Sequence, residues 1–430
     1  MWKVLAATWA LLFGLLLLML GNGIQGTLLG IRGDLEGFST FEMSLVMSAY
    51  FVGFLGGSRM TPELIRRVGH VRVFAALGSF ISAVLILFPL ITEPWAWMAF
   101  RVVIGFCFSG VYVTVEGWLN NTVDNENRGK ALSLYLIVQM AGIIAAQGFI
   151  AWGDPSGYAM FIIPSVLVSI AFAPILLSVT PTPPFEMTQP MSPWEAFQIS
   201  PLGCVGMFAL GGMFSALFGM TAVYGTQVGL SVGQISLFIA MIYVGGLLMQ
   251  YPIGWLSDRT DRRVLILAVN AAGGVAAAIA AIFGGNFVVI LAASFVIGGT
   301  ANPLYALLLA YVNDFLDNEK MAGASGALVF VNGIGAVAGP VVTGWMMSAV
   351  GPWGFWLYLS ILMLGLAAYA VWRMTRRPST VAIEETGPYA PITQVGSVAY
   401  TPLAQDYYSG TDDAGEAETA TNEISREPLG

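Results

Sequence analysis

Charge, histidine and cysteine are all scarce in this chain. Only 10% of its 430 residues are Asp, Glu, Lys or Arg, and it has one His and two Cys. Cys107 and Cys204 fall in apolar stretches without C-x-x-C spacing or a nearby His, which favours small apolar residues over metal ligands or a redox pair. The single His70 lies among arginines and is expected to be exposed to solvent. The sequence shows no nucleophile–base pair, zinc spacing or nucleic-acid patch, so we expect no enzyme, no metal, no cofactor and no nucleic-acid partner.

Charge is missing altogether from two long stretches. The 62 residues 196–257 and the 50 residues 264–313 contain no Asp, Glu, Lys or Arg, and 57% of the chain is hydrophobic. Such stretches are too long for one core helix or strand, and a helix needs about 20 apolar residues to cross a bilayer. The lipid bilayer is therefore an expected partner. Residues 4–31 are also uncharged, which is too long for a signal peptide and predicts a retained first helix.

Turn residues divide the chain into twelve predicted membrane spans and hence an all-α membrane protein. The spans are 5–30, 41–59, 72–91, 95–118, 130–152, 157–179, 202–227, 233–256, 264–283, 287–312, 322–348 and 353–374. The Pro-rich loop 180–201 separates spans six and seven, so we predict bundles at 1–179 and 202–374. Residues 375–430 are predicted to form a disordered tail. The last 50 residues hold nine acidic groups against Arg426, and the remaining 380 residues are neutral.

Basic residues predict the orientation, because Lys and Arg concentrate in cytoplasmic loops. With the N-terminus inside, 15 of the 17 basic residues are cytoplasmic. Arg32 lies outside and Arg101 lies within a span. Both chain ends are then cytoplasmic.

An internal repeat supports the division into two halves. Val103-Ile104-Gly105 recurs 193 residues later as Val296-Ile297-Gly298. At the same offset Tyr112 corresponds to Tyr305, and Gly142 to Gly335. We expect two homologous six-helix bundles that run in the same direction through the membrane.

One charged island interrupts the apolar second half. Its spacing is Gly254, then Asp258-Arg259, then Arg262-Arg263. This resembles motif A of the major facilitator superfamily, G-x-x-x-D-R-x-G-R-R, with Asp261 in place of a Gly. The resemblance implies a twelve-helix carrier with a gate at the cytoplasmic end, where the motif joins helix ends and stabilises the outward-open state.

A damaged copy of the motif lies 192 residues upstream. Pro62 replaces the first Gly, Arg66 replaces the Asp, and Arg67, Gly69 and Arg72 complete it. The loss of Gly and Asp puts in doubt that the two halves lock in the same way.

Two further segments resemble family motifs. Arg101 and Gly105 match the R-x-x-x-G core of motif B, and Arg101 is expected either to face the pathway or to snorkel outward. The Gly-Pro motif C is absent from span five, and a similar pattern appears in span eleven at Gly335, Gly339, Pro340 and Gly344. We expect these residues to serve helix packing or to form a hinge.

The segments RVVIGFCFSGVYVTVEGWLNN, NRGKALSLY and QYPIGWLSDR are similar to those of the YcaD-like bacterial carriers. The resemblance covers most of residues 1–375. It implies a bacterial inner-membrane transporter and carries no substrate.

Polar side chains within spans are costly without partners and form the candidate pathway. The pathway candidates are Asn22, Gln25, Arg101, Tyr112, Gln139, Tyr224, Asn302, Tyr305 and Asn332. Gln147 and Gln250 belong to the same inventory. Hydrogen bonds between helices are the alternative role for each amide.

Two acidic residues near the cytoplasmic ends of spans are candidate charge partners. Glu116 is expected either to carry a proton or to pair with Arg67 or Arg72, and Asp314 is expected opposite Arg262. We therefore expect a monomeric secondary or facilitative carrier of a small organic solute, with export and coupling to a proton or other ion left open. The alternative is a transport-inactive membrane sensor or scaffold that uses the acidic tail as an interaction arm.

Overall fold

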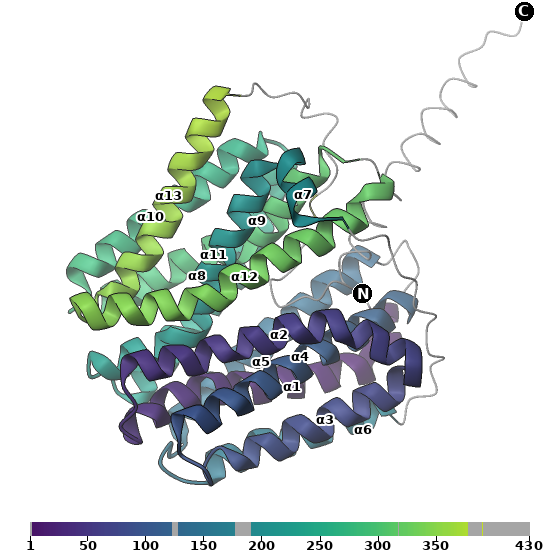
Figure 1. Ribbon diagram of the computed structural model, residues 1–430, viewed down its shortest axis with the longest axis vertical. Helices are drawn as coiled ribbons and strands as arrows, with labels where there is room; N and C mark the ends of the chain where they lie inside the picture. Colours follow the sequence, from purple (N-terminus) through teal and green to yellow (C-terminus); the bar gives the residue numbers. More distant parts are fainter. Residues whose placement is uncertain (1, 123–127, 177–190, 317, 377–388, 390–430) are drawn as a thin grey trace, which may run out of the picture.

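The computed structural model describes residues 2–122, 128–176, 191–316, 318–376 and 389, and the regular secondary structure of this part of the chain is helical (Figure 1). The helices are α1 (Trp2–Leu35), α2 (Thr40–Val68), α3 (His70–Leu87), α4 (Pro94–Thr122), α5 (Arg128–Trp152), α6 (Ala159–Leu176), α7 (Pro193–Ile199), α8 (Pro201–Gln227), α9 (Val232–Ser257), α10 (Arg262–Phe283), α11 (Phe287–Asn313), α12 (Asn318–Val350) and α13 (Gly354–Arg376).

Eleven of these helices are long and apolar enough to cross a membrane. The shorter apolar helix α6 is the sixth span of the sequence analysis, and the seven-residue α7 lies in the loop between the halves. Large apolar side chains such as Phe80, Leu248 and Ile282 are exposed on the outside of the bundle. Such an apolar surface is suited to contact with lipid. The helices also satisfy their own backbone hydrogen bonds, as the interior of a bilayer requires.

The helices form two bundles with the same internal packing (Figure 1). In the first, α1 packs on α5 and α6, α2 packs on α4, and α3 packs on α4 and α6. In the second, α8 packs on α12 and α13, α9 on α11, and α10 on α11 and α13. This correspondence confirms the predicted repeat of six helices.

Glycines bring equivalent helices together in both bundles. A methyl group at Gly105 would overlap the carbonyl oxygen of Tyr50, and one at Gly298 would overlap that of Ile242. Only a residue without Cβ permits such close approach of two helix backbones. The glycine shared by the two copies of the V-I-G repeat therefore has the same structural role in each half.

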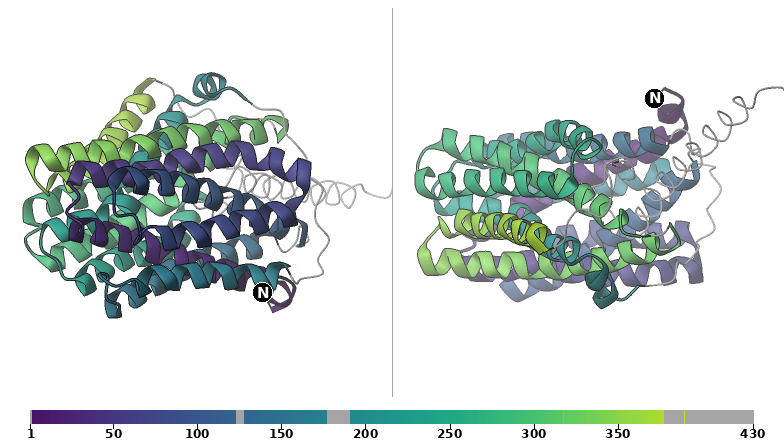
Figure 2. Two further views of the ribbon diagram at one scale, coloured as in Figure 1. Left: turned by 60° about the horizontal axis from the view of Figure 1, so that its bottom comes forward. Right: turned by 90° about the horizontal axis from the view of Figure 1, so that it is seen from above.

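The two bundles meet most closely at the predicted outer end. There a Cβ at Gly30 would overlap Ala222 of the other bundle, and Gln227 donates a hydrogen bond to Thr40. Figure 1 shows α2 and α12 diverging toward the end where the N-terminus lies, and the views of Figure 2 show the helices of both bundles running along one common axis. The bundles therefore pack together at the predicted outer end and separate toward the predicted cytoplasmic end.

Helix boundaries agree with the predicted spans to within a few residues except in α1, α2 and α12, which are longer. Span two was expected to end at residue 59, but α2 continues through Pro62 to Val68. Glu63 binds both Arg66 and Arg67 within the last turn, and the helix ends at Gly69, whose φ is 86°. The damaged motif copy is thus largely helical.

One further expectation is corrected, and two others concern residues that lie largely outside the described part of the chain. His70 was predicted to be exposed, yet it is buried where α3 packs near α4. The tail predicted to be disordered from residue 375 falls outside the described residues beyond α13, with the exception of Tyr389, which is buried. Residues 180–190 of the predicted loop 180–201 also lie outside the described residues.

Candidate functional site

A cavity lies between the two bundles. Helices α1, α2 and α5 of the first bundle and α8, α11 and α12 of the second line it. Its lining residues are Asn22, Tyr50, Phe51, Phe54, Leu55, Ser58, Ile143, Phe214, Phe218, Tyr305, Val329, Asn332, Gly333 and Ala336.

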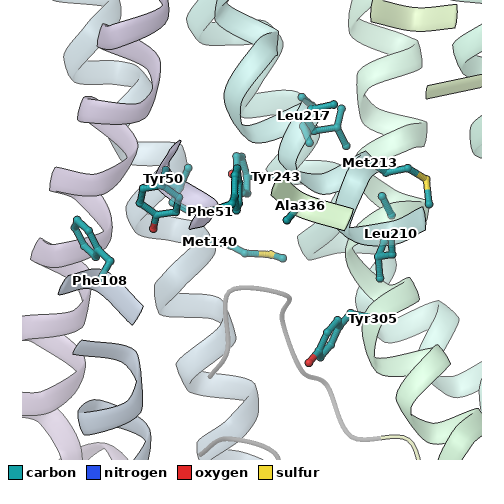
Figure 3. Close-up of a cluster of buried hydrophobic side chains, with 14 of the residues drawn as sticks. Tyr50, Phe51, Phe108, Met140, Leu210, Met213, Leu217, Tyr243, Tyr305 and Ala336 are labelled. Atoms are coloured by element: carbon teal, nitrogen blue, oxygen red, sulfur yellow. The ribbon is translucent and has the colours of Figure 1, made fainter. Parts of the chain in front are cut away.

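Aromatic rings form the largest part of the cavity wall and connect the two bundles. The ring of Phe218 on α8 lies 5.6 Å from that of Tyr50 and 6.1 Å from that of Phe51 on α2. Phe214 stacks on Phe218 at 6.2 Å. Figure 3 shows Tyr50 and Phe51 on the side of the first bundle, with Tyr305 extending from the second. A flat apolar ligand in this cavity would contact aromatic rings of both bundles.

Three of the candidate pathway residues lie on the cavity wall: Asn22, Tyr305 and Asn332. The Asn22 carbonyl oxygen is buried and has no hydrogen-bond partner within the described residues. The Asn332 side-chain amide donates a 3.0 Å hydrogen bond to the carbonyl of Met207 in its own bundle. The Asn22 amide thus lies on the wall without a contact to the second bundle among these hydrogen bonds, whereas the Asn332 amide holds helices together.

Arg101 lies fully buried behind this wall, at 0% exposure. It donates to Gln25 Oε1 at 3.0 Å and to the Met47 sulfur at 3.5 Å, and its guanidinium lies 4.6 Å from the ring centre of Tyr50. Outward snorkelling, one of the two expectations for Arg101, is therefore wrong. Among the described residues no carboxylate lies within the 4.0 Å limit of an ion pair, so the ring and the amide are its partners.

The other pathway candidates are placed elsewhere. The Tyr112 hydroxyl contacts the Met19 sulfur at 3.4 Å, and Asn302 donates 2.9 Å to the carbonyl of Gly298 in its own helix. Tyr224 stacks on Phe355 at 5.2 Å inside the second bundle. Gln139 is buried on α5. None of these four is among the residues that line the cavity.

The two predicted charge partners have different surroundings. Asp314, at the end of α11, forms an ion pair with Arg262, whose Nη1 also donates 3.2 Å to the carbonyl of Ala310. Glu116 is fully buried and accepts a 2.8 Å hydrogen bond from Tyr135. Arg67, one of the two cations expected near Glu116, binds Glu63 instead, and Arg72 is exposed.

The intact motif joins three helix ends of the second bundle. Asp258 caps the C-terminus of α9, and Arg262 at the start of α10 reaches Ser257 at 3.2 Å and Asp314 on α11. Arg263 pairs with Asp261 at 2.7 Å, and Arg259 lies 4.4 Å over the ring of Trp255. A cation at the C-terminus of α11 is also favoured by the helix dipole. In the damaged copy, Arg66 and Arg67 bind only within their own helix in the contacts that the structure gives.

The glycines of span eleven face neighbouring helices. A Cβ at Gly335 or Gly339 would overlap atoms of α8, and one at Gly344 would overlap Ser44 of the other bundle. Pro340 lies inside α12. The same helix thus packs within its own bundle and across the interface.

Sequence reasoning missed the aromatic wall itself. Phe214 and Phe218 are four residues apart on α8, as are Tyr50 and Phe54 on α2, so each pair lies on one helix face. An apolar pair in a membrane helix is equally compatible with lipid, with the bundle core or with a cavity. Only the structure separates these cases.

Two like bundles of membrane helices around a cavity define a polytopic membrane transporter. The family model of the Major Facilitator Superfamily matches residues 11–242 and 202–405, and the chain belongs to this family. The chain is 28% identical to an uncharacterized MFS-type transporter of Enterobacter sp. (strain 638). The 341 aligned residues cover 78% of this chain and 88% of that protein. This chain is 27% identical to the uncharacterized MFS-type transporter YcaD of Escherichia fergusonii, with the same coverage.

A solved structure shows the same fold. The crystal structure of the nucleoside transporter NupG superposes with a TM-score of 0.67 over 86% of this chain and 99% of that one, at 15% identity. A mutant form of the same transporter gives a TM-score of 0.71 over 84% of this chain, at 14% identity. At these identities the likeness concerns the fold alone.

Proposed function

We propose that the protein carries a small organic solute with a flat apolar part through the cavity between its bundles by alternating access. The observation that carries this proposal is the composition of the wall, in which rings from α2 and α8 meet across the interface beside the Asn22 amide. Aromatic walls with a few polar groups are typical of sites for organic ligands. Because the wall belongs to both bundles, rocking of one against the other would expose the cavity to each side in turn.

The membrane and the orientation form part of the same proposal. The bacterial relatives and the distribution of basic residues support an inner-membrane protein with both chain ends in the cytoplasm. A reporter fused after Gly430 is expected to be active only in the cytoplasm. A reporter found on the outer side contradicts this orientation.

Flux in proteoliposomes tests the transport proposal. We expect uptake of at least one solute from a library of aromatic and amphipathic metabolites, and we expect Phe218→Ala to raise its KM about tenfold or more, since a buried Phe contributes ~1.5–3 kcal/mol. Phe208→Ala on the same helix is the matched control, because Phe208 is exposed on the outside of the bundle; its KM should stay unchanged.

Two results would contradict the proposal. Equal effects of the two substitutions on KM would show that the ligand does not bind at the aromatic wall. Absence of flux for every solute, together with a partner protein that needs residues 379–430, would favour the sensor or scaffold.

A further inference from the structure

Tyr389 is buried although it belongs to the acidic tail. Twelve residues, 377–388, separate it from the end of α13, and its side chain lies between α9 and α11 of the second bundle. Its backbone N–H donates 2.7 Å to Asp258 of motif A. The tail therefore returns to the motif that joins the helix ends at the predicted cytoplasmic end.

The residues that contact Tyr389 form a binding site for a phenol ring. Gln250 Nε2 donates 2.8 Å to the Tyr389 hydroxyl, which lies 3.4 Å from the carbonyl oxygen of Pro303. The ring packs on Gly254, where a Cβ would lie only 2.7 Å from a ring carbon. The Gln250 carbonyl oxygen is itself buried without a partner within the described residues, so the amide has further hydrogen-bonding capacity in this pocket.

This site is particular to the second bundle. Pro303 corresponds in the repeat to Gly110, and there a Cβ would lie 2.7 Å from the Thr61 hydroxyl oxygen of α2. Helices α2 and α4 thus contact each other directly at this level. In the second bundle the equivalent level of α9 and α11 holds the ring of Tyr389 between Gly254 and Pro303.

We propose that Gln250, Gly254, Asp258 and Pro303 form a tyrosyl-binding site whose ligand is the chain's own Tyr389, and that its occupation holds the cytoplasmic end open. The second part rests on the proposed function, in which rocking of the bundles closes that end. The docked tail places its backbone N–H on Asp258 at the end of α9, the helix that packs against α5 of the first bundle. Only twelve residues connect Tyr389 to α13, which gives it an effective concentration on the order of millimolar, and the ring and three hydrogen bonds, with Asp258, Gln250 and Pro303, hold it in the site.

Photo-crosslinking tests the docking without any transported solute. p-Benzoylphenylalanine replaces Tyr389 in the full chain, and a protease site is inserted after Thr380. After irradiation and cleavage, the tail should stay joined to the body on a denaturing gel, with the adduct mapping near Gly254 or Pro303. The same replacement at Tyr400, eleven residues further along the tail, is the matched control and should give at least about fivefold less adduct.

Two site variants complete that experiment. Gly254→Val fills the space of the ring and should abolish the adduct, and Gln250→Ala, which leaves the backbone untouched, should reduce it. Equal adduct from positions 389 and 400, or an adduct insensitive to both variants, would overturn the site.

Spin labels test the conformational consequence. Val71 and Val264 are exposed at the predicted cytoplasmic ends of α3 and α10 and are equivalent in the repeat. With labelled cysteines there, Tyr389→Ala should shift the distance distribution toward shorter values, and Tyr400→Ala should leave it unchanged. If the adduct forms and the distances do not respond, the tail docks without holding the end open, and that part of the proposal is wrong.

Discussion

At the scale of single residues, buried charge distinguishes the two copies of motif A. The Arg262 and Asp314 side chains are 2% and 6% exposed, whereas Arg66 and Glu63 are 63% and 37% exposed. A buried pair is costly to break, because the remaining charge loses its partner without regaining water. The intact copy should therefore contribute to the stability of its bundle, and the damaged copy should not.

Asp314→Asn tests this difference. The substitution keeps the size of the side chain and removes one of the two carboxylates near the buried Arg262 guanidinium, the other being Asp258 at 3.9 Å, so we expect a loss of ~1–3 kcal/mol of stability. The readout is thermal unfolding of the purified protein followed by fluorescence. Glu63→Gln removes the exposed partner in the other half and should give no measurable shift. Equal shifts for the two variants would show that burial does not decide the role of the motif.

The sequence located some cavity residues and missed others for a definite reason. Asn22, Tyr305 and Asn332 were recognisable because polar groups are rare in apolar spans. Phe208, Phe214 and Phe218 lie on one helix and have the same chemistry, yet Phe208 is exposed and the other two line the cavity. In a membrane both lipid and core are apolar, so hydrophobicity cannot tell these positions apart.

At the scale of helices, contacts through glycine hold each bundle together. Gly53 of α2 packs on the backbone of Val102 in α4, and Gly245 of α9 packs on that of Phe295 in α11. Close backbone approach is the main source of helix association in lipid, where burial of apolar side chains gains little. The helices could be predicted because their apolar length is explicit. The end of α2 could not, because the ion pairs of Glu63 with Arg66 and Arg67 extend the helix beyond the apolar stretch.

Gly335→Ala should destabilise the second bundle. The new methyl group would overlap the carbonyl oxygen of Phe208, which belongs to the backbone of α8 and cannot rotate away. Overpacking of this kind costs about 1–3 kcal/mol, which should appear as a lower unfolding temperature and yield. Gly365→Ala is the control, because no atom lies within 4 Å of its added Cβ. A destabilisation by Gly365→Ala as large as that by Gly335→Ala would argue against backbone contact as the cause.

At the scale of the whole molecule, the two bundles contact each other unequally along the membrane. Gly30 and Ala222 meet at the predicted outer end, and Gly344 meets Ser44 there. At the opposite end the bundles diverge (Figure 1). Under the proposed function, this arrangement is the state in which the outer end is closed.

This account is tested most directly in a variant that cannot close the outer end. Spin labels are used to measure one distance between the bundles at the outer end and one at the cytoplasmic end. Gly30→Val places a side chain against Ala222, and Gly148→Val, with no atom within 4 Å of its added Cβ, is the control. One label pair is Leu90 with Ile282 at the outer end, and the other is Val71 with Val264. Rocking bundles predict that Gly30→Val lengthens the outer distance and shortens the cytoplasmic one. Unchanged distances, or lengthening at both ends, would contradict alternating access around the central cavity.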